Sequence, residues 1–73
     1  MADVKANLAG TVFRVAVVVG DRVEVGQEVV RLESMKMEIP IETPVAGTVS
    51  AVLVTEGAFV NDGDALLIVD PDA

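Results

Sequence analysis

The sequence of 73 residues contains no cysteine and no histidine. Without cysteine the protein can form neither disulfides nor a thiolate metal site, and without histidine it lacks the usual general base and the usual nitrogen ligand of metals. Its aromatic residues are two phenylalanines, with no tryptophan or tyrosine, so platforms on which nucleic acid bases stack are missing as well. We therefore expect no catalytic residues, no metal site and a role other than that of an enzyme.

Basic residues are also scarce, because five lysines and arginines face twelve acids and leave a formal net charge of −7. This surplus of acids argues against binding to nucleic acid or to anionic membranes, both of which attract basic patches. No strictly apolar run is longer than the five residues of 15–19, which is too short to span a bilayer, and the N-terminus lacks the pattern of a signal peptide. We expect a monomeric cytoplasmic protein whose partners are other proteins.

An internal repeat organises the chain. Residues 8–32 align with residues 45–69 without a gap, at an offset of 37, and nine of the 25 aligned positions are identical. The identical residues in the first copy are Ala9, Gly10, Thr11, Val12, Val15, Val17, Gly20, Val23 and Gly26. The sequence is thus two copies of one unit joined by a central segment, and we expect residues 1–73 to form one domain.

Short valine-rich segments separated by glycine-containing turns recur in both copies, a pattern typical of an all-β sandwich or flattened barrel. The glycines fit turns with positive φ or close backbone contacts. Residues 70–73 read as a polar tail, and residues 1–5 as a terminal strand or a loose segment. We expect strands over residues 11–18 and 48–54, around Val23 and Val60, and over residues 28–33 and 65–69.

The central segment reads Glu-Ser-Met-Lys-Met-Glu over residues 33–38. If Met35 and Lys36 form a two-residue turn, antiparallel pairing sets Ser34 opposite Met37, Glu33 opposite Glu38, Leu32 opposite Ile39 and Val30 opposite Ile41. This register matches apolar with apolar residues, and a shift by one would expose one strand's apolar side chains. The sequence predicts a β-hairpin with Lys36 at its tip, although an amphipathic helix over residues 27–39 is an alternative that periodicity alone leaves open.

Two features of this hairpin break local rules. Glu33 and Glu38 place like charges across the ladder, and a primed two-residue turn needs positive φ, which favours asparagine and glycine over Met-Lys. Such departures are expected at functional sites. Pro40 and Pro44 mark the outgoing strand as an edge strand or a bulged strand.

Lys36 is the candidate functional residue. An exposed amine on a rigid hairpin suits a substrate that another enzyme docks on and acylates, and nothing in the sequence predicts the apolar burial that would make it a catalyst. Met35 and Met37 are candidate recognition residues and also candidates for flexible core filler, and the two roles are compatible. Lys5, the other lysine, reads as a solvated side chain, and residues 61–64 contain acids but lack the spacing of a calcium loop.

The segment from Glu33 to Pro40 resembles the attachment motif of the biotinyl/lipoyl domain family, in which a Met-Lys-Met tripeptide marks the lysine that takes biotin. Residues 44–49, 56–57 and 63–66, together with Val60, resemble the family's second half. The resemblance covers nearly the whole chain. It is strongest to the small free-standing biotin/lipoyl attachment proteins of bacteria.

The resemblance implies a flattened barrel of two four-stranded antiparallel sheets related by quasi-two-fold symmetry, with the modified lysine between the fourth and fifth strands. It implies that a biotin protein ligase attaches biotin to Lys36, and that this biotin carries a carboxyl group from a biotin carboxylase to a carboxyltransferase. The residues implied in recognition by the ligase are Glu33, Ser34, Met35, Met37 and Glu38.

The motif departs from the family in ways that leave alternatives open. Biotin carriers most often have alanine where this chain has Ser34, and residues 6–10 lack the Pro-Met-Pro-Gly run of larger carriers. Lipoyl domains more often place aspartate before the lysine and alanine after it, so Met35 and Met37 favour biotin over lipoate. The alternatives are a lipoyl carrier modified on Lys36 and an unmodified module whose hairpin binds a partner protein.

Overall fold

The computed structural model describes residues 1–72, which form eight β-strands and no helix. The all-β prediction is therefore confirmed. A helix over residues 27–39 was the alternative, and it is wrong, because residues 28–39 lie in two strands and the turn between them. The strands are β1 (Ala2–Lys5), β2 (Gly10–Val15), β3 (Arg22–Val23), β4 (Glu28–Ser34), β5 (Met37–Glu42), β6 (Gly47–Val52), β7 (Phe59–Val60) and β8 (Ala65–Pro71).

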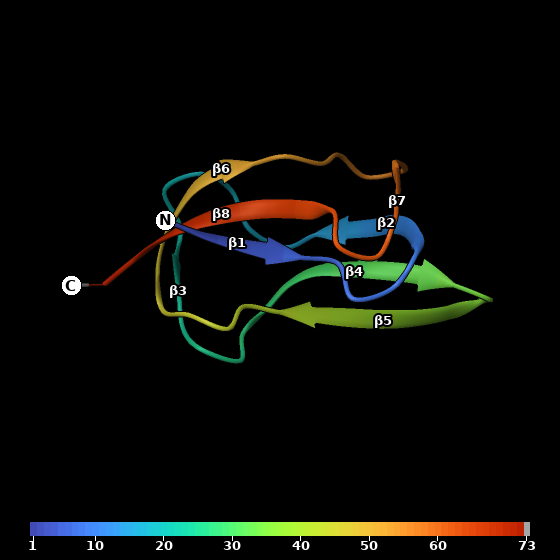
Figure 1. The fold of residues 1–73 in the computed structure, drawn as a ribbon, viewed down its shortest axis with the longest axis horizontal. Helices are drawn as coiled ribbons and strands as arrows, with labels where there is room; N and C mark the ends of the chain where they lie inside the picture. The colour runs from blue at the N-terminus through green and yellow to red at the C-terminus, as the bar shows by residue number, and fades with distance from the viewer. Residues whose placement is uncertain (73) are drawn as a thin grey trace.

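The strands make two four-stranded antiparallel sheets, with the orders β1-β8-β6-β3 and β5-β4-β2-β7 (Figure 1). The two orders are equivalent under the repeat. If β1, β2, β3 and β4 are exchanged with β5, β6, β7 and β8, respectively, the first order becomes the second. Each sheet therefore takes strands from both halves of the sequence, and neither half forms a sheet by itself. The internal repeat is thus a quasi-two-fold symmetry in space.

The symmetry extends to individual hydrogen bonds between the halves. The backbone N–H of Gly20 donates to the carbonyl of Val49, and that of Gly57 donates to the carbonyl of Val12, both at 2.8 Å. The two donors, like the two acceptors, are 37 residues apart. Both glycines have positive φ, 98° and 93°, a backbone that glycine adopts without steric cost. The same turn thus ties each half to the other.

The hydrophobic core between the sheets consists of aliphatic side chains, and Thr43 is the one buried polar residue among residues 1–72. The side chains of Leu32, Leu66 and Leu67 are fully buried, and each contributes about 1.5–3 kcal/mol by leaving water. The remaining buried apolar residues are Val4, Ala6, Val12, Val17, Val23, Val29, Val30, Ile41, Val49, Val60 and Val69. Most are β-branched residues, which pack well on a pleated sheet.

Strand ends differ from the sequence-based expectations in three places. Strand β8 runs to Pro71 and pairs with β6. The prediction of a polar tail over residues 70–73 is therefore wrong for Asp70 and Pro71. Ala73 lies outside the described residues. Strands β2 and β6 end at Val15 and Val52, earlier than predicted. The chain after β2 leads into a turn, in which the N–H of Asp21 donates to the carbonyl of Val18 at 3.0 Å. Residues 2–5 form a strand, which settles the open question about the N-terminus.

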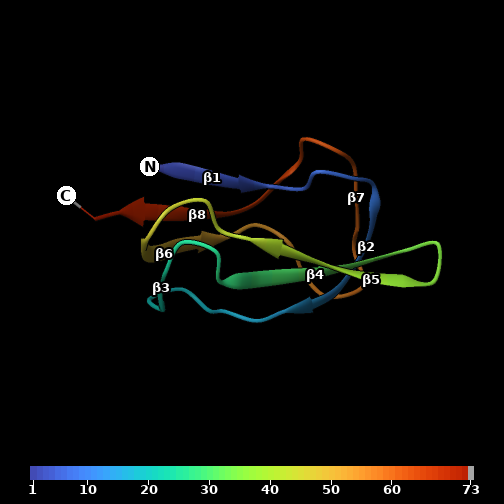
Figure 2. The same ribbon diagram turned by 90° about the horizontal axis from the view of Figure 1, so that it is seen from below.

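The molecule is elongated, with extents of 38 × 19 × 18 Å. The N-terminus and the end of β8 lie together at one end, and the β4–β5 hairpin projects at the opposite end (Figures 1 and 2). At the terminal end, Ala2 pairs with Val69 across strands β1 and β8. The fold therefore holds the predicted site at the end of its long axis.

Candidate functional site

The β4–β5 hairpin has the register that the sequence predicts. Leu32 pairs with Ile39, Glu33 with Glu38, and Ser34 with Met37. Because Ser34 ends β4 and Met37 begins β5, Met35 and Lys36 are the two central residues of the turn. The pairing prediction is confirmed.

The turn has an unusual backbone. Met35 and Lys36 have φ angles of 52° and 63°, and they are the only non-glycine residues with positive φ among residues 1–72. Positive φ at both central positions is the mark of a type I′ hairpin turn, which favours asparagine and glycine. Such a conformation costs a residue with a longer side chain about 1–3 kcal/mol. The departure from local rules noted in the sequence is therefore a real strain at the tip.

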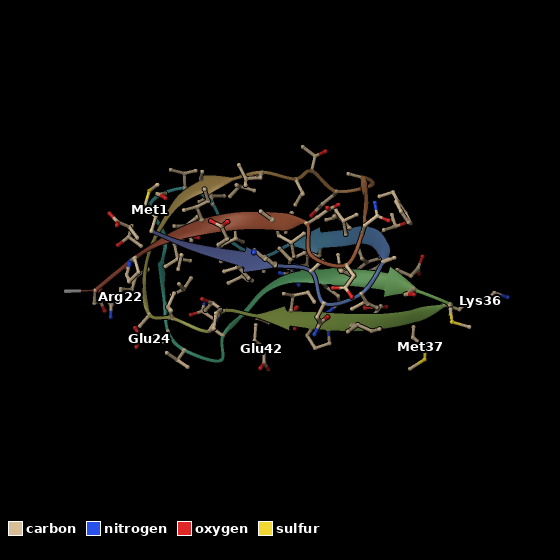
Figure 3. The ribbon with its side chains drawn as sticks, viewed as in Figure 1. Met1, Arg22, Glu24, Lys36, Met37 and Glu42 are labelled. Carbon is tan, nitrogen blue, oxygen red and sulfur yellow. The ribbon has the colours of Figure 1, made fainter. Side chains whose placement is uncertain are left out.

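The side chains at the tip point into solvent. Lys36 is exposed and projects away from both sheets (Figure 3). Met35 is 93% exposed and Met37 is 64% exposed, so neither packs into the core. The interpretation of these methionines as core filler is wrong, because the last fully buried residue of β4 is Leu32 and the hairpin beyond it extends past the sandwich.

An ion-pair network lies at the base of the hairpin. The guanidinium of Arg31 donates through Nη2 to Glu28 Oε1 at 2.7 Å and through Nε to Glu28 Oε2 at 3.1 Å. Its Nη1 also donates to Glu38 Oε1 at 3.1 Å. These bonds raise the pKa of Arg31, and the hydrogen bond from Arg31 lowers the pKa of Glu28. The network joins β4 to β5 and offsets the repulsion that Glu38 meets from Glu33.

The strands beneath the tip are held close together. A Cβ atom on Gly10 would lie 2.7 Å from the carbonyl oxygen of Glu33, a distance that real Cβ contacts avoid. Only glycine lets β2 approach β4 here. On the other side, β5 is the edge strand of its sheet and contains Pro40, as predicted. The proline removes a backbone donor at that edge.

Sequence reasoning missed the role of Arg31 and the position of the aromatic residues. Both phenylalanines are exposed, and both belong to strands of the sheet that bears the tip, Phe13 in β2 and Phe59 in β7. The repeat contained a signal for this asymmetry, because the aligned residues in the other copy are the polar Ser50 and Arg22.

Residues 1–72 contain no detected pocket and no group of three or more acids that could hold a metal ion. The acids of residues 61–64 serve a turn, in which Asp64 Oδ2 accepts a hydrogen bond from the N–H of Asn61 at 2.8 Å. Since the described residues form only strands and connecting loops, they include no helix long and apolar enough to cross a membrane.

Two interleaved sheets that hold one exposed lysine on a hairpin turn have the architecture of an attachment domain. The sequence matches the family described as biotin-requiring enzyme over residues 2–69. It is 53% identical over 64 residues to the biotin/lipoyl attachment protein of Bacillus subtilis (strain 168), covering 88% of each chain. The chain belongs to the biotinyl/lipoyl attachment family.

Other relatives extend this similarity in two directions. The chain is 43% identical over 67 residues to the biotinylated protein TB7.3 homolog of Mycobacterium leprae (strain TN), covering 92% of this chain and 94% of that one. It is also similar to a single-chain, multi-domain long-chain acyl-CoA carboxylase of solved structure, with a TM-score of 0.90 and 39% identity. That match covers 99% of this chain and only 7% of the carboxylase, so the chain corresponds to one small part of that protein.

Proposed function

We propose that the chain is a biotin carrier in which a biotin protein ligase attaches biotin to Lys36. The observation that carries this proposal is the tip itself, where the lysine amine is exposed at the end of the molecule between two exposed methionines. No side chain of residues 1–72 pairs with the Lys36 amine in an ion pair. The amine is therefore free to react when a ligase docks on the tip.

Attachment joins the Lys36 Nζ to the carboxyl carbon of biotin as an amide, with net loss of water from the amine and the carboxyl group at the expense of ATP. The amide is neutral, so the loaded side chain can enter the active site of a partner without the cost of burying an ammonium ion. Lys36 would hold the biotin, which when bound would supply the carrier chemistry, the transfer of a carboxyl group between a biotin carboxylase and a carboxyltransferase. The chain itself contributes no catalytic group to this transfer.

The protein's contribution is to position and tether. The β4–β5 ladder and the Arg31 network fix the direction of the hairpin, and the turn holds Lys36 beyond the sandwich. Tethering makes transfer between two partner sites effectively intramolecular and raises the local concentration. We assign recognition by the ligase to the side chains that surround the lysine, which are Glu33, Ser34, Met35, Met37 and Glu38.

The partners proposed are the ligase, a biotin carboxylase and a carboxyltransferase. Support for the carboxylase partners comes from relatives named as carboxyl carriers or carboxylases, among them the biotin carboxyl carrier protein of Streptococcus mutans, 47% identical over 64 residues, and pyruvate carboxylase of Bacillus subtilis, 34% identical over 69 residues. The chain spans 49% of the first of these and 6% of the second. A single domain over residues 1–73, a monomeric state, a cytoplasmic location and the absence of nucleic acid or membrane partners stay predictions.

A lipoyl carrier is the second candidate. The chain is 39% identical over 64 residues to the dihydrolipoyllysine-residue acetyltransferase component of the Azotobacter vinelandii pyruvate dehydrogenase complex, and the Bacillus relative is named for both groups. Methionine on both sides of Lys36 favours biotin, since the lipoyl motif more often has aspartate and alanine there.

Purified protein incubated with a biotin protein ligase, biotin and ATP tests the proposal. We expect one biotinyl group on the wild type, none on Lys36→Arg and one on Lys5→Arg, with all three proteins folded by circular dichroism. Lys5 is the matched control because it is the other lysine of the chain and is also exposed. Biotin on the Lys36→Arg protein would refute the site.

A further inference from the structure

The oxidisable side chains of this protein are concentrated at the tip. The chain has no cysteine, histidine, tryptophan or tyrosine, and it has three methionines. Sulfur is therefore present in methionine alone, as a thioether that peroxides convert to a sulfoxide. Two of the three methionines, Met35 and Met37, flank Lys36.

The exposure of these methionines makes them accessible to oxidants in solution. Met35 and Met37 are 93% and 64% exposed, and Met1 is 87% exposed. Met1 lies at the opposite end of the molecule from Lys36 (Figure 3). No methionine belongs to the buried core, which consists of valine, leucine, isoleucine and alanine. Oxidation therefore alters the surface around Lys36 and leaves the packing between the sheets intact.

We propose that Met35 and Met37 form an oxidation-sensitive pair that controls the loading of Lys36, so that their sulfoxides block modification of the lysine by its ligase. This inference rests on the proposed function, because it concerns the recognition of the same tip. In each residue a hydroperoxide transfers one oxygen atom to sulfur. The sulfide is oxidised to a sulfoxide, and the peroxide is reduced to water or to the corresponding alcohol. A methionine sulfoxide reductase reverses the step at the expense of a dithiol, which becomes a disulfide, with release of water.

The physical reason for a block is desolvation. A thioether can enter an apolar site on a partner at little cost, whereas a sulfoxide is a strong hydrogen-bond acceptor. Burying such a polar group without a donor costs about 1–3 kcal/mol by protein mutational data. Met35 and Met37 lie on either side of Lys36, and a ligase that reaches the amine must cover both. The fold is spared because neither side chain is buried.

The test compares untreated and peroxide-treated protein. The protein is oxidised with hydrogen peroxide until peptide mapping shows sulfoxide at both tip positions, and the peroxide is then removed before biotin protein ligase, biotin and ATP are added. We expect the initial rate of biotinylation to fall roughly tenfold or more, in keeping with the cost of one buried sulfoxide. Treatment with methionine sulfoxide reductases of both stereospecificities should restore it. An unchanged rate with both residues fully oxidised would overturn the inference.

The matched variant is Met35→Leu with Met37→Leu, which keeps both positions apolar and similar in size but removes the thioethers. Its Met1 is oxidised as in the wild type, so it controls for damage elsewhere. We expect its loading rate to be the same before and after peroxide. If peroxide slows this variant as much as the wild type, the block does not arise at the tip and the inference fails.

Two further readouts separate the possible failures. Urea unfolding of the oxidised protein should match that of the untreated protein, because a drop in stability would trace the loss of loading to the fold and overturn the proposed cause. Untreated wild type that accepts no biotin would contradict the proposed function itself. Wild type that is loaded equally well in both states would contradict only the inference.

Discussion

The two ends of the molecule are built alike and differ in what they carry. At one end β4 and β5 pair through Leu32 and Ile39. At the other end β8 and β1 pair through Val69 and Ala2, which lie 37 residues from Leu32 and Ile39, the same offset as in the repeat. The pairing interruption near Glu28 in β4 also recurs near Ala65 in β8. The scaffold is therefore the same at both ends.

The difference lies beyond these pairs. The β4–β5 end is closed by the strained turn at Met35 and Lys36, whereas no turn joins β8 to β1 at the other end, where the N-terminus and the end of β8 lie. At the open end, Arg22 instead pairs with Asp72, joining β3 to the segment after β8. The comparison shows that the sandwich is a scaffold common to both ends of the molecule. What distinguishes the site is a short turn with its flanking side chains.

The largest expected effect comes from moving the turn. In a circular permutant, Val69 is joined to Ala2 through the sequence Glu-Ser-Met-Lys-Met-Glu. The chain is opened in the original turn, between Met35 and Lys36, and Lys36→Arg removes the original lysine. Because the pairs at both ends are equivalent, the new hairpin should form in the same register. We expect ligase to biotinylate the transplanted lysine, as measured by intact mass with a fragment map.

The control for this experiment is the same permutant with arginine in place of the transplanted lysine, which should carry no biotin. A permutant that is folded but unmodified would show that residues outside the turn are required. The exposed Phe59, whose equivalent at the open end is Arg22, would then be the first residue to examine.

A smaller effect should come from relieving the turn. Lys36→Gly removes the side chain at a φ of 63°, so we expect the free energy of unfolding in urea to rise by about 1 kcal/mol. Lys5→Gly is the matched control. It lies at the end of strand β1 without positive φ, and we expect a decrease of roughly 0.5–1 kcal/mol. Loss of stability in both variants would contradict the assignment of strain to the tip.

The smallest expected effect concerns the ion pair that only the closed end has, since the repeat places Ala65 and Ile68 where Glu28 and Arg31 stand. Arg31 lowers the pKa of Glu28 in the folded protein. The pair therefore adds stability above the ordinary pKa of glutamate, and this contribution is lost as the pH falls through the lowered folded value. We expect Glu28→Gln to be slightly less stable than wild type at pH 7, with a smaller difference at a second, acidic pH below the ordinary glutamate pKa of about 4.3. Urea unfolding at both pH values measures the difference in free energy of unfolding between the two proteins. An equal difference at both pH values would argue against a stabilising ion pair between Glu28 and Arg31.

The sequence predicted the hairpin register, the position of Lys36 and the pairing of two similar halves. It could do so because alternation with a period of two and a repeat without gaps both constrain backbone pairing. The strain at Met35 and Lys36 was also foreseeable, because a two-residue turn in this register requires positive φ whatever residues occupy it.

Other features depend on how far strands continue and where long side chains reach. Asp70 and Pro71 are residues that strands disfavour, so the sequence predicts a tail there. Strand β8 nevertheless includes them, because β6 offers pairing partners. The exposure of Met37 depends on how far the hairpin extends past the last buried residue of β4. The bridge from Arg31 to Glu38 spans two strands diagonally, and rotamers, which sequence patterns do not specify, decide whether it forms.

The most direct test of the central claim is the intact mass, with a fragment map, of the protein co-expressed with a biotin protein ligase and a lipoate ligase. The account predicts one biotinyl group on Lys36 and no modification of Lys5. A lipoyl group on Lys36 in place of biotin would contradict the proposed cofactor. An unmodified Lys36 in the presence of both active ligases would contradict the carrier function and favour a hairpin that binds a partner protein directly.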